Sequence, residues 1–93
     1  MPVTARHLII QGRVQGVFYR NWAVALARDL SLSGWVRNRR DASVEMWVEG
    51  AAEAIEQFIA QAHEGPPAAR VLRVIAQPVE TEGFVGFEKR PTA

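Results

Sequence analysis

The sequence contains no cysteine, and this absence excludes several kinds of chemistry. Without cysteine there is no disulfide, no thiolate nucleophile and no Cys-based zinc site, and nothing argues for an oxidising compartment. Histidine is also scarce, because His7 and His63 are the only two and lie far apart in the sequence. There is no HExxH motif and no paired acidic motif of the metal-ligand type. We therefore expect a cytoplasmic protein with no metal and no other cofactor.

A strong excess of charge and long hydrophobic runs are lacking as well. Eleven basic and ten acidic residues give a formal net charge of +1, so any anion-binding site must be local rather than a general basic surface. The apolar run at residues 8–10 is far too short for a signal peptide or a membrane span. We expect no nucleic-acid and no membrane partner. With 48% hydrophobic residues, residues 1–93 can form one domain around one core, and we expect a monomer.

Hydrophobic periodicity predicts the element order β-α-β-β-α-β. This is the order of the ferredoxin-like split βαβ motif, an α+β fold in which an antiparallel sheet carries two helices on one face. Phe84 and Phe87 indicate a short additional strand that returns to the sheet edge, and the fourth strand has an imperfect alternation that is typical of a bulge. The expected strands cover residues 6–11, 35–38, 43–49 and 71–79, and the expected helices cover residues 19–30 and 51–63.

Apolar residues predict which faces of these elements are buried. The strand over residues 43–49 places Val44, Met46 and Val48 on one face, which we expect to lie against the core. The first helix has an apolar residue at every fourth position, and we expect this stripe to be buried. The stripe consists of Phe18, Trp22, Leu26 and Leu30.

The most informative segment is the glycine-bearing loop over residues 12–20, GRVQGVFYR, which opens the first helix. A helix leaves its first N–H groups without partners, and a Ser, Thr, Asp or Asn usually caps them. The segment contains none of these residue types, and Arg20 falls in the first helical turn. The helix dipole disfavours a cation there unless an anion offsets it. The segment therefore predicts a bound anion, such as inorganic phosphate.

The same segment resembles the signature of the acylphosphatase family, G-x-V-Q-G-V-x-[FY]-R, at every fixed position. A second family signature, G-[FYW]-[AVC]-x-N-x-x-x-G-x-V, is similar to residues 34–44, except that Ala42 replaces the usual glycine. An alanine forced to positive φ in this turn would cost about 1 kcal/mol. The resemblance implies the ferredoxin-like fold and the hydrolysis of the carboxyl-phosphate bond of small acyl phosphates.

The resemblance also implies the residues of the site. Arg20 would be the phosphate-binding catalytic arginine, and Asn38 would position the attacking water. A planar guanidinium can hold two phosphate oxygens, and an amide can orient a water through its donor and acceptor. No metal is needed, since a carboxylate is a stable leaving group and positioning supplies most of the rate. The phosphate-binding loop would consist of Gln15, Gly16, Val17, Phe18, Tyr19 and Arg20.

Residues next to Asn38 are candidates for supporting roles. Trp35 could shape the substrate pocket, and Ser43 could hydrogen-bond to Asn38. Arg37 and the two arginines that follow Asn38 indicate a solvated hairpin whose positive field attracts an anionic substrate.

Two other functions stay open from the sequence. One is a non-catalytic phosphate- or carboxylate-binding module, such as the acylphosphatase-like domain of larger carbamoyl-transferring maturation proteins, but the presence of Arg20 and Asn38 argues against it. The other is a nucleic-acid-binding ferredoxin-like domain, which would need exposed aromatics on its sheet and a basic surface. The near-neutral charge argues against this second alternative.

Overall fold

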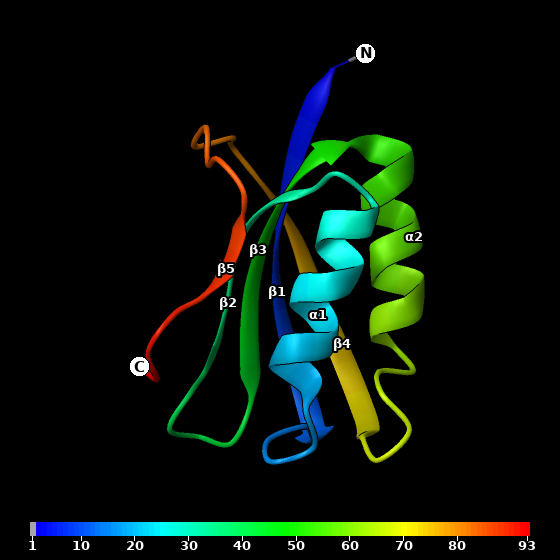
Figure 1. The fold of residues 1–93 in the computed structure, drawn as a ribbon, viewed down its shortest axis with the longest axis vertical. Helices are drawn as coiled ribbons and strands as arrows, with labels where there is room; N and C mark the ends of the chain where they lie inside the picture. Colours follow the sequence, from blue (N-terminus) through cyan, green and yellow to red (C-terminus); the bar gives the residue numbers. More distant parts are fainter. Residues whose placement is uncertain (1) are drawn as a thin grey trace.

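Two helices cover one face of a five-stranded sheet in the computed structural model, which describes residues 2–93 (Figure 1). This arrangement confirms the ferredoxin-like α+β fold. The predicted element order is also confirmed, and the predicted short additional strand forms at the C-terminal end, where it includes Phe87 but not Phe84. The strands are β1 (Val3–Arg13), β2 (Ser33–Asn38), β3 (Val44–Ala51), β4 (Arg70–Val79) and β5 (Phe87–Lys89), and the helices are α1 (Tyr19–Asp29) and α2 (Ala52–Ala62).

The sheet has the strand order β4-β1-β3-β2-β5. The first four strands in this order pair antiparallel, as the sequence predicts, whereas β5 pairs parallel with β2. The chain crosses from one sheet edge to the other after β4 and reverses its direction on the way. Because β2 also runs opposite to β4, β5 and β2 run the same way, and the sheet is mixed at this edge.

The core lies between the sheet and the helices, and the buried face of β3 is the predicted one, with Val44, Met46 and Val48 all fully buried. The predicted apolar stripe of α1 is confirmed only in part. The fully buried residues of this helix are Tyr19, Ala23 and Ala27, while Phe18, at the N-cap position, is 78% exposed. The other three residues of the predicted stripe flank the core and are partly buried. Small alanine side chains let α1 approach the sheet closely, which an apolarity pattern weighted towards large residues misses.

The pairing of β1 with β4 contains the predicted irregularity. Gln11 lies opposite Arg73 and Gly12 lies opposite Val71, so Leu72 is an extra residue on β4. At this point the two backbones approach very closely, since a Cβ on Gly12 would lie 2.2 Å from the Arg70 carbonyl oxygen. The end of β1 therefore requires glycine, and it is this end that leads into the loop before α1 (Figure 1).

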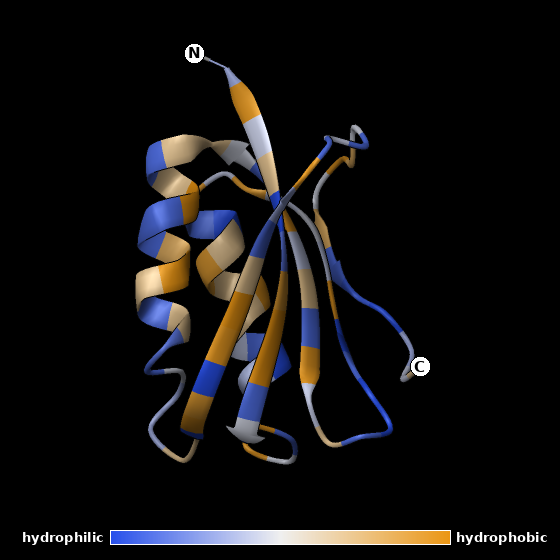
Figure 2. Ribbon diagram, turned by 180° about the vertical axis from the view of Figure 1, so that it is seen from behind, coloured by the Kyte–Doolittle hydropathy of each residue, from blue (hydrophilic) through white to orange (hydrophobic). Residues whose placement is uncertain are grey.

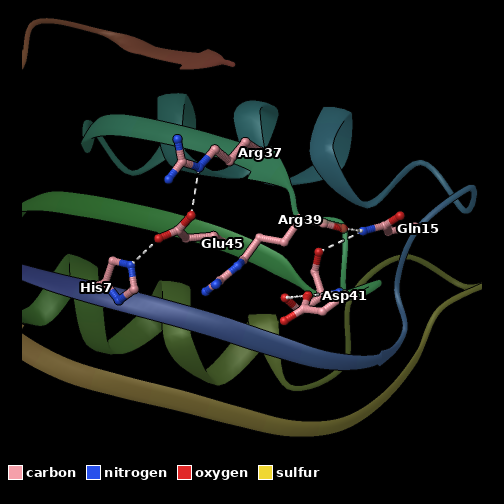
Figure 3. Close-up of polar contacts among 7 residues, drawn as sticks. His7, Gln15, Arg37, Arg39, Asp41 and Glu45 are labelled. Carbon is pink, nitrogen blue, oxygen red and sulfur yellow. Dashed lines mark hydrogen bonds and ion pairs between the residues drawn. The ribbon is translucent and has the colours of Figure 1, made fainter. Parts of the chain in front are cut away.

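An ion-pair network lies on the face of the sheet away from the helices. Figure 2 views the sheet from this face. Glu45 on β3 accepts from His7 Nε2 at 2.6 Å and from Arg37 Nε at 2.7 Å (Figure 3). Burial of the Glu45 carboxylate favours its neutral form, but the hydrogen bonds from His7 and Arg37 outweigh this effect and hold its pKa below the usual range. The network joins β1, β3 and β2.

We expect Glu45→Gln to lower the free energy of unfolding at pH 7 by about 1 to 2 kcal/mol, because hydrogen bonds to a largely buried charge are lost. A carboxyl with a lowered folded-state pKa contributes stability above its unfolded pKa and loses it as pH falls through the folded pKa. The difference between the parent and the variant should therefore shrink below about pH 4. Urea denaturation across this pH range measures it.

Glu56→Gln is the matched control. Its carboxylate is 73% exposed and lies 3.9 Å from the Arg6 guanidinium, so the same substitution should cost less than about 0.5 kcal/mol. Equal losses in the free energy of unfolding for the two substitutions would contradict a stabilising role for the Glu45 hydrogen bonds between strands.

The β2–β3 turn contains the alanine that departs from the family signature. Ala42 has φ 75°, so the predicted left-handed conformation is confirmed. We expect Ala42→Gly to raise the free energy of unfolding by up to about 1 kcal/mol, since glycine adopts this conformation without strain. Thermal or urea denaturation tests this, with Ala60→Gly in the exposed part of α2 as the control. The control should destabilise by about 1 kcal/mol, and destabilisation by both would refute the strain at Ala42.

Candidate active site

The N-terminus of α1 has no side-chain cap, as the sequence predicts. Phe18 occupies the N-cap position in the left-handed region, with φ 65° and ψ 19°. The first helical hydrogen bond runs from the Trp22 N–H to the Phe18 carbonyl, at 3.0 Å. The N–H groups of Tyr19, Arg20 and Asn21 therefore have no partner within the helix. The first turn also contains no acidic residue, so no side chain of this turn offsets the positive end of the helix dipole.

A cavity of about 300 Å³ lies at this helix end and brings Arg20 and Asn38 together. Arg20 comes from the first turn of α1, and Asn38 comes from the last residue of β2, eighteen positions later in the sequence. Figure 1 shows why they meet, because the loop before α1 and the β2–β3 turn lie at the same end of the molecule. The cavity is lined by Val14, Gly16, Phe18, Tyr19, Arg20, Asn21, Asn38 and Lys89.

The Asn38 side chain carries a hydrogen-bond acceptor that the fold does not use. Its Oδ1 is buried and has no hydrogen-bond partner within residues 2–93. The backbone around it is fixed, since Asn38 pairs with Val44 on β3 and its carbonyl accepts from the Ala93 N–H at 3.1 Å. Leaving a buried acceptor unpaired costs about 1 to 3 kcal/mol, so such a group calls for a water or a substrate.

Gln15 contributes to the site by holding the loop rather than by lining the cavity. Its Nε2 donates to the carbonyls of Arg39 at 2.7 Å and Ser43 at 2.8 Å, which ties the loop to the β2–β3 turn (Figure 3). This contact fixes the distance between the α1 N-terminus and Asn38. Val17 is 6% exposed and packs in the core, so of the predicted loop only Gly16, Phe18, Tyr19 and Arg20 line the cavity.

Tyr19 lines the cavity, but its hydroxyl group serves the fold. The hydroxyl donates to the Ala62 carbonyl at 2.7 Å and thereby ties the start of α1 to the end of α2. Burial raises the pKa of Tyr19 well above its ordinary value. The phenol therefore stays protonated and is not a candidate for acid-base chemistry at neutral pH.

Two predicted supporting roles, a hydrogen bond from Ser43 to Asn38 and a place for Trp35 in the substrate pocket, are wrong. The Ser43 hydroxyl donates to Asp41 Oδ1 at 2.6 Å and so closes the turn instead of contacting Asn38. Trp35 does not line the cavity. Its ring lies 4.8 Å from the Arg37 guanidinium and 5.1 Å from that of Arg90. Strand alternation places Trp35 and Arg37 on the face away from the helices, so Arg37 belongs to the Glu45 network rather than to a free cationic hairpin.

Sequence reasoning missed three lining residues, Val14, Asn21 and Lys89. Val14 and Asn21 flank the loop and the first helical turn, so their positions follow from the loop itself. Lys89 has no such signal, because only the crossing of the chain to the β2 edge brings β5 to this cavity.

Within the part of the chain that the structure describes, no three His, Asp or Glu side chains cluster as metal ligands. Neither helix in residues 2–93 is long and apolar enough to cross a membrane.

The structure thus combines an α+β fold with a cavity at an uncapped helix N-terminus. The family model for acylphosphatases matches residues 6–89, and the chain belongs to the acylphosphatase family. The hydrolase activity expected from the sequence is thereby confirmed at the level of the family.

Individual proteins agree with this assignment. An acylphosphatase of Acidovorax sp. is 52% identical over 87 residues, which cover 94% of this chain and 90% of that protein. The crystal structure of acylphosphatase from Bacillus subtilis is similar with a TM-score of 0.92 at 32% identity, covering 94% of this chain and 98% of that one. A crystal structure of full-length HypF in the phosphate- and nucleotide-bound form is similar with a TM-score of 0.91 at 29% identity, covering 98% of this chain and 12% of that one.

Proposed function

We propose that this acylphosphatase hydrolyses small acyl phosphates to a carboxylate and inorganic phosphate in the cavity between the α1 N-terminus and Asn38, without a metal or cofactor. One observation carries the proposal. A free helix N-terminus, an arginine without an ion-pair partner in residues 2–93 and an unpartnered buried amide oxygen line the same cavity. Each of these groups suits a different part of a phosphoryl group under attack by water.

The phosphoryl group would be held by the loop and by Arg20. The unpaired N–H groups at the start of α1 donate to phosphate oxygens, and the helix dipole favours the negative charge. The Arg20 guanidinium binds two further oxygens and stays charged at every relevant pH. The backbone donors are held in place before the substrate arrives, because Gln15 ties the loop to the β2–β3 turn and Tyr19 ties the helix start to α2. Fixed donors need little reorganisation as charge develops in the transition state.

Asn38 would position the attacking water. Its Oδ1 accepts a hydrogen bond from the water, which lies in line with the bond to be broken. The water oxygen forms a bond to phosphorus, the bond between phosphorus and the acyl oxygen breaks, and the electron pair leaves on the carboxylate. The water proton passes to a phosphate oxygen or to solvent. No side chain has to protonate the leaving group, because a carboxylate is stable as an anion at neutral pH.

Hydrolysis of benzoyl phosphate by the purified protein in the presence of a chelator tests this function. We expect turnover that the chelator does not change, and competitive inhibition by inorganic phosphate. A folded protein that binds phosphate and does not hydrolyse benzoyl phosphate would instead be a binding module. Activity that disappears with the chelator and returns with a divalent metal would refute the metal-free mechanism.

We also propose that the protein acts as a monomer in the cytoplasm. The residues assigned to the site all come from one chain, so a second copy adds nothing that the mechanism requires. The absence of cysteine agrees with a reducing compartment. In the same assay, the specific activity should be independent of enzyme concentration.

A further inference from the structure

Lys89 lines the cavity, although nothing in the proposed mechanism uses it. It is the only lysine in the chain. It is the last residue of β5, and its side chain is exposed to solvent. The ion pairs within residues 2–93 join Arg6 to Glu56 and Glu45 to both His7 and Arg37, so Lys89 takes part in none of them. The cavity therefore has a second cation beside Arg20, and this cation is free to bind a ligand.

A groove continues from the cavity along α1 and β5. It has a volume of about 370 Å³, and it shares Asn21 and Lys89 with the cavity, so the two spaces adjoin. Its walls are held together by Arg28 on α1, whose Nη2 donates to the Phe87 carbonyl on β5 at 3.0 Å. The groove is lined by Asn21, Val24, Ala25, Arg28, Glu88 and Lys89.

The position of the groove points to the acyl group of the substrate. When the phosphoryl group lies against the loop N–H groups and Arg20, the acyl group must leave the cavity through an opening. The groove is such an opening, and Lys89 lies where the cavity and the groove meet. Val24 and Ala25 offer an apolar wall for a short carbon chain, while Lys89 and Arg28 outnumber the one acid, Glu88.

We propose that Lys89 is a specificity residue that favours acyl phosphates with a second anionic group, such as a carboxylate, at the far end of a short acyl chain. The proposal rests on the proposed function and adds a preference among its substrates. Lys89 would pair with the distal anion in the groove, while Arg20 and the loop hold the phosphoryl group. An ammonium suits this task because it binds an anion as a point charge and tolerates several approach directions.

Succinyl phosphate and butanoyl phosphate form a matched pair of substrates, because they differ in a terminal carboxylate against a methyl group. We expect the parent to show the higher kcat/KM for succinyl phosphate at low ionic strength, and added salt to reduce the difference. Lys89→Met should lower the ratio of the two kcat/KM values about threefold to fivefold, as for an exposed ion pair. Lys89→Arg should restore the ratio, and Lys89→Glu should lower it further.

Arg73→Met is the control for net charge, because Arg73 lies on β4 at the sheet edge opposite β5. It should leave the ratio unchanged. Inhibition by inorganic phosphate separates the two possible roles of Lys89. If Lys89→Met weakens phosphate inhibition and the turnover of both substrates alike, Lys89 belongs to the phosphate site and the proposal is overturned.

The remaining outcomes are also decisive. A ratio that Lys89→Met leaves unchanged, in a parent that hydrolyses both substrates, overturns the role of Lys89 but leaves the proposed function intact. A folded parent that hydrolyses neither substrate overturns both.

Discussion

Replacing Arg20 with alanine is expected to lower kcat/KM for benzoyl phosphate by about a thousandfold or more, and to weaken inhibition by inorganic phosphate. Arginines that stabilise a transferring phosphoryl group contribute about 10³ to 10⁵ in rate. Arg20 makes no ion pair within residues 2–93, and its side chain is partly exposed. The free energy of unfolding should therefore change by less than about 0.5 kcal/mol. Steady-state kinetics with urea denaturation of the same samples measures both quantities.

Two further variants make the result specific to the guanidinium of Arg20. Arg20→Lys keeps the positive charge but cannot hold two oxygens in a planar fork, so it should recover only a small part of the lost activity. Arg13→Ala removes an exposed arginine that precedes the loop and does not line the cavity. It should retain most of the activity. Comparable losses in Arg13→Ala and Arg20→Ala would mean that a general positive field, rather than a fixed contact, drives the reaction.

The fold could be predicted because its strands and helices differ clearly in hydrophobic period. The alternation of Val44, Met46 and Val48 identifies the buried face of β3 without any knowledge of its neighbours. The buried face of α1 could not be found in this way. Ala23 and Ala27 reach the sheet because they are small, and the choice between an alanine face and a large apolar face depends on the distance between the layers. That distance is a property of the assembled core.

The direction of β5 relative to its neighbour is likewise a tertiary property. Phe87 marks the strand in the sequence, but its partner is decided by the chain between Val79 and Phe87, which crosses the sheet. Within this segment the backbone N–H of Gly83 donates to Glu49 Oε2 at 3.1 Å. A carboxylate on β3 thus holds the connecting segment, and this contact between distant residues could not be predicted from the local sequence.

In the candidate site, too, some residues could be predicted from the sequence and others could not. Arg20 and Asn38 could be predicted because each belongs to a local signature, and the structure places both at one cavity. Two other features could not be predicted, because they depend on contacts between segments that are distant in the sequence. These are the hydrogen bonds from Gln15 to the β2–β3 turn and the position of Lys89 at the cavity. Ala42 is an intermediate case. The signature identifies the turn position, and the structure supplies the φ of 75° that makes alanine costly there.

Asn38→Ala is expected to lower kcat by about a hundredfold to a thousandfold with little change in inhibition by inorganic phosphate. In the proposed mechanism the amide acts on the attacking water rather than on the phosphoryl group, so its loss should affect the transition state and spare ground-state binding. This separation of kcat from phosphate affinity distinguishes Asn38 from Arg20, whose loss should affect both. Measuring kcat and the phosphate inhibition constant in the two alanine variants tests it. Parallel losses in both constants for Asn38→Ala would place the amide on the phosphate instead.

Stability gives a second and independent test of the same residue. Because Oδ1 of Asn38 makes no hydrogen bond to residues 2–93, Asn38→Ala removes no such bond from the fold and should leave the free energy of unfolding nearly unchanged. Asn38→Asp should weaken phosphate binding by repulsion, because it places a second negative charge in the cavity that the phosphate would occupy. If Asn38 instead stabilised the fold through its side-chain contacts, Asn38→Ala would lower the free energy of unfolding. Unchanged stability together with a large loss of kcat would show that the Asn38 amide is kept for the reaction rather than for the fold.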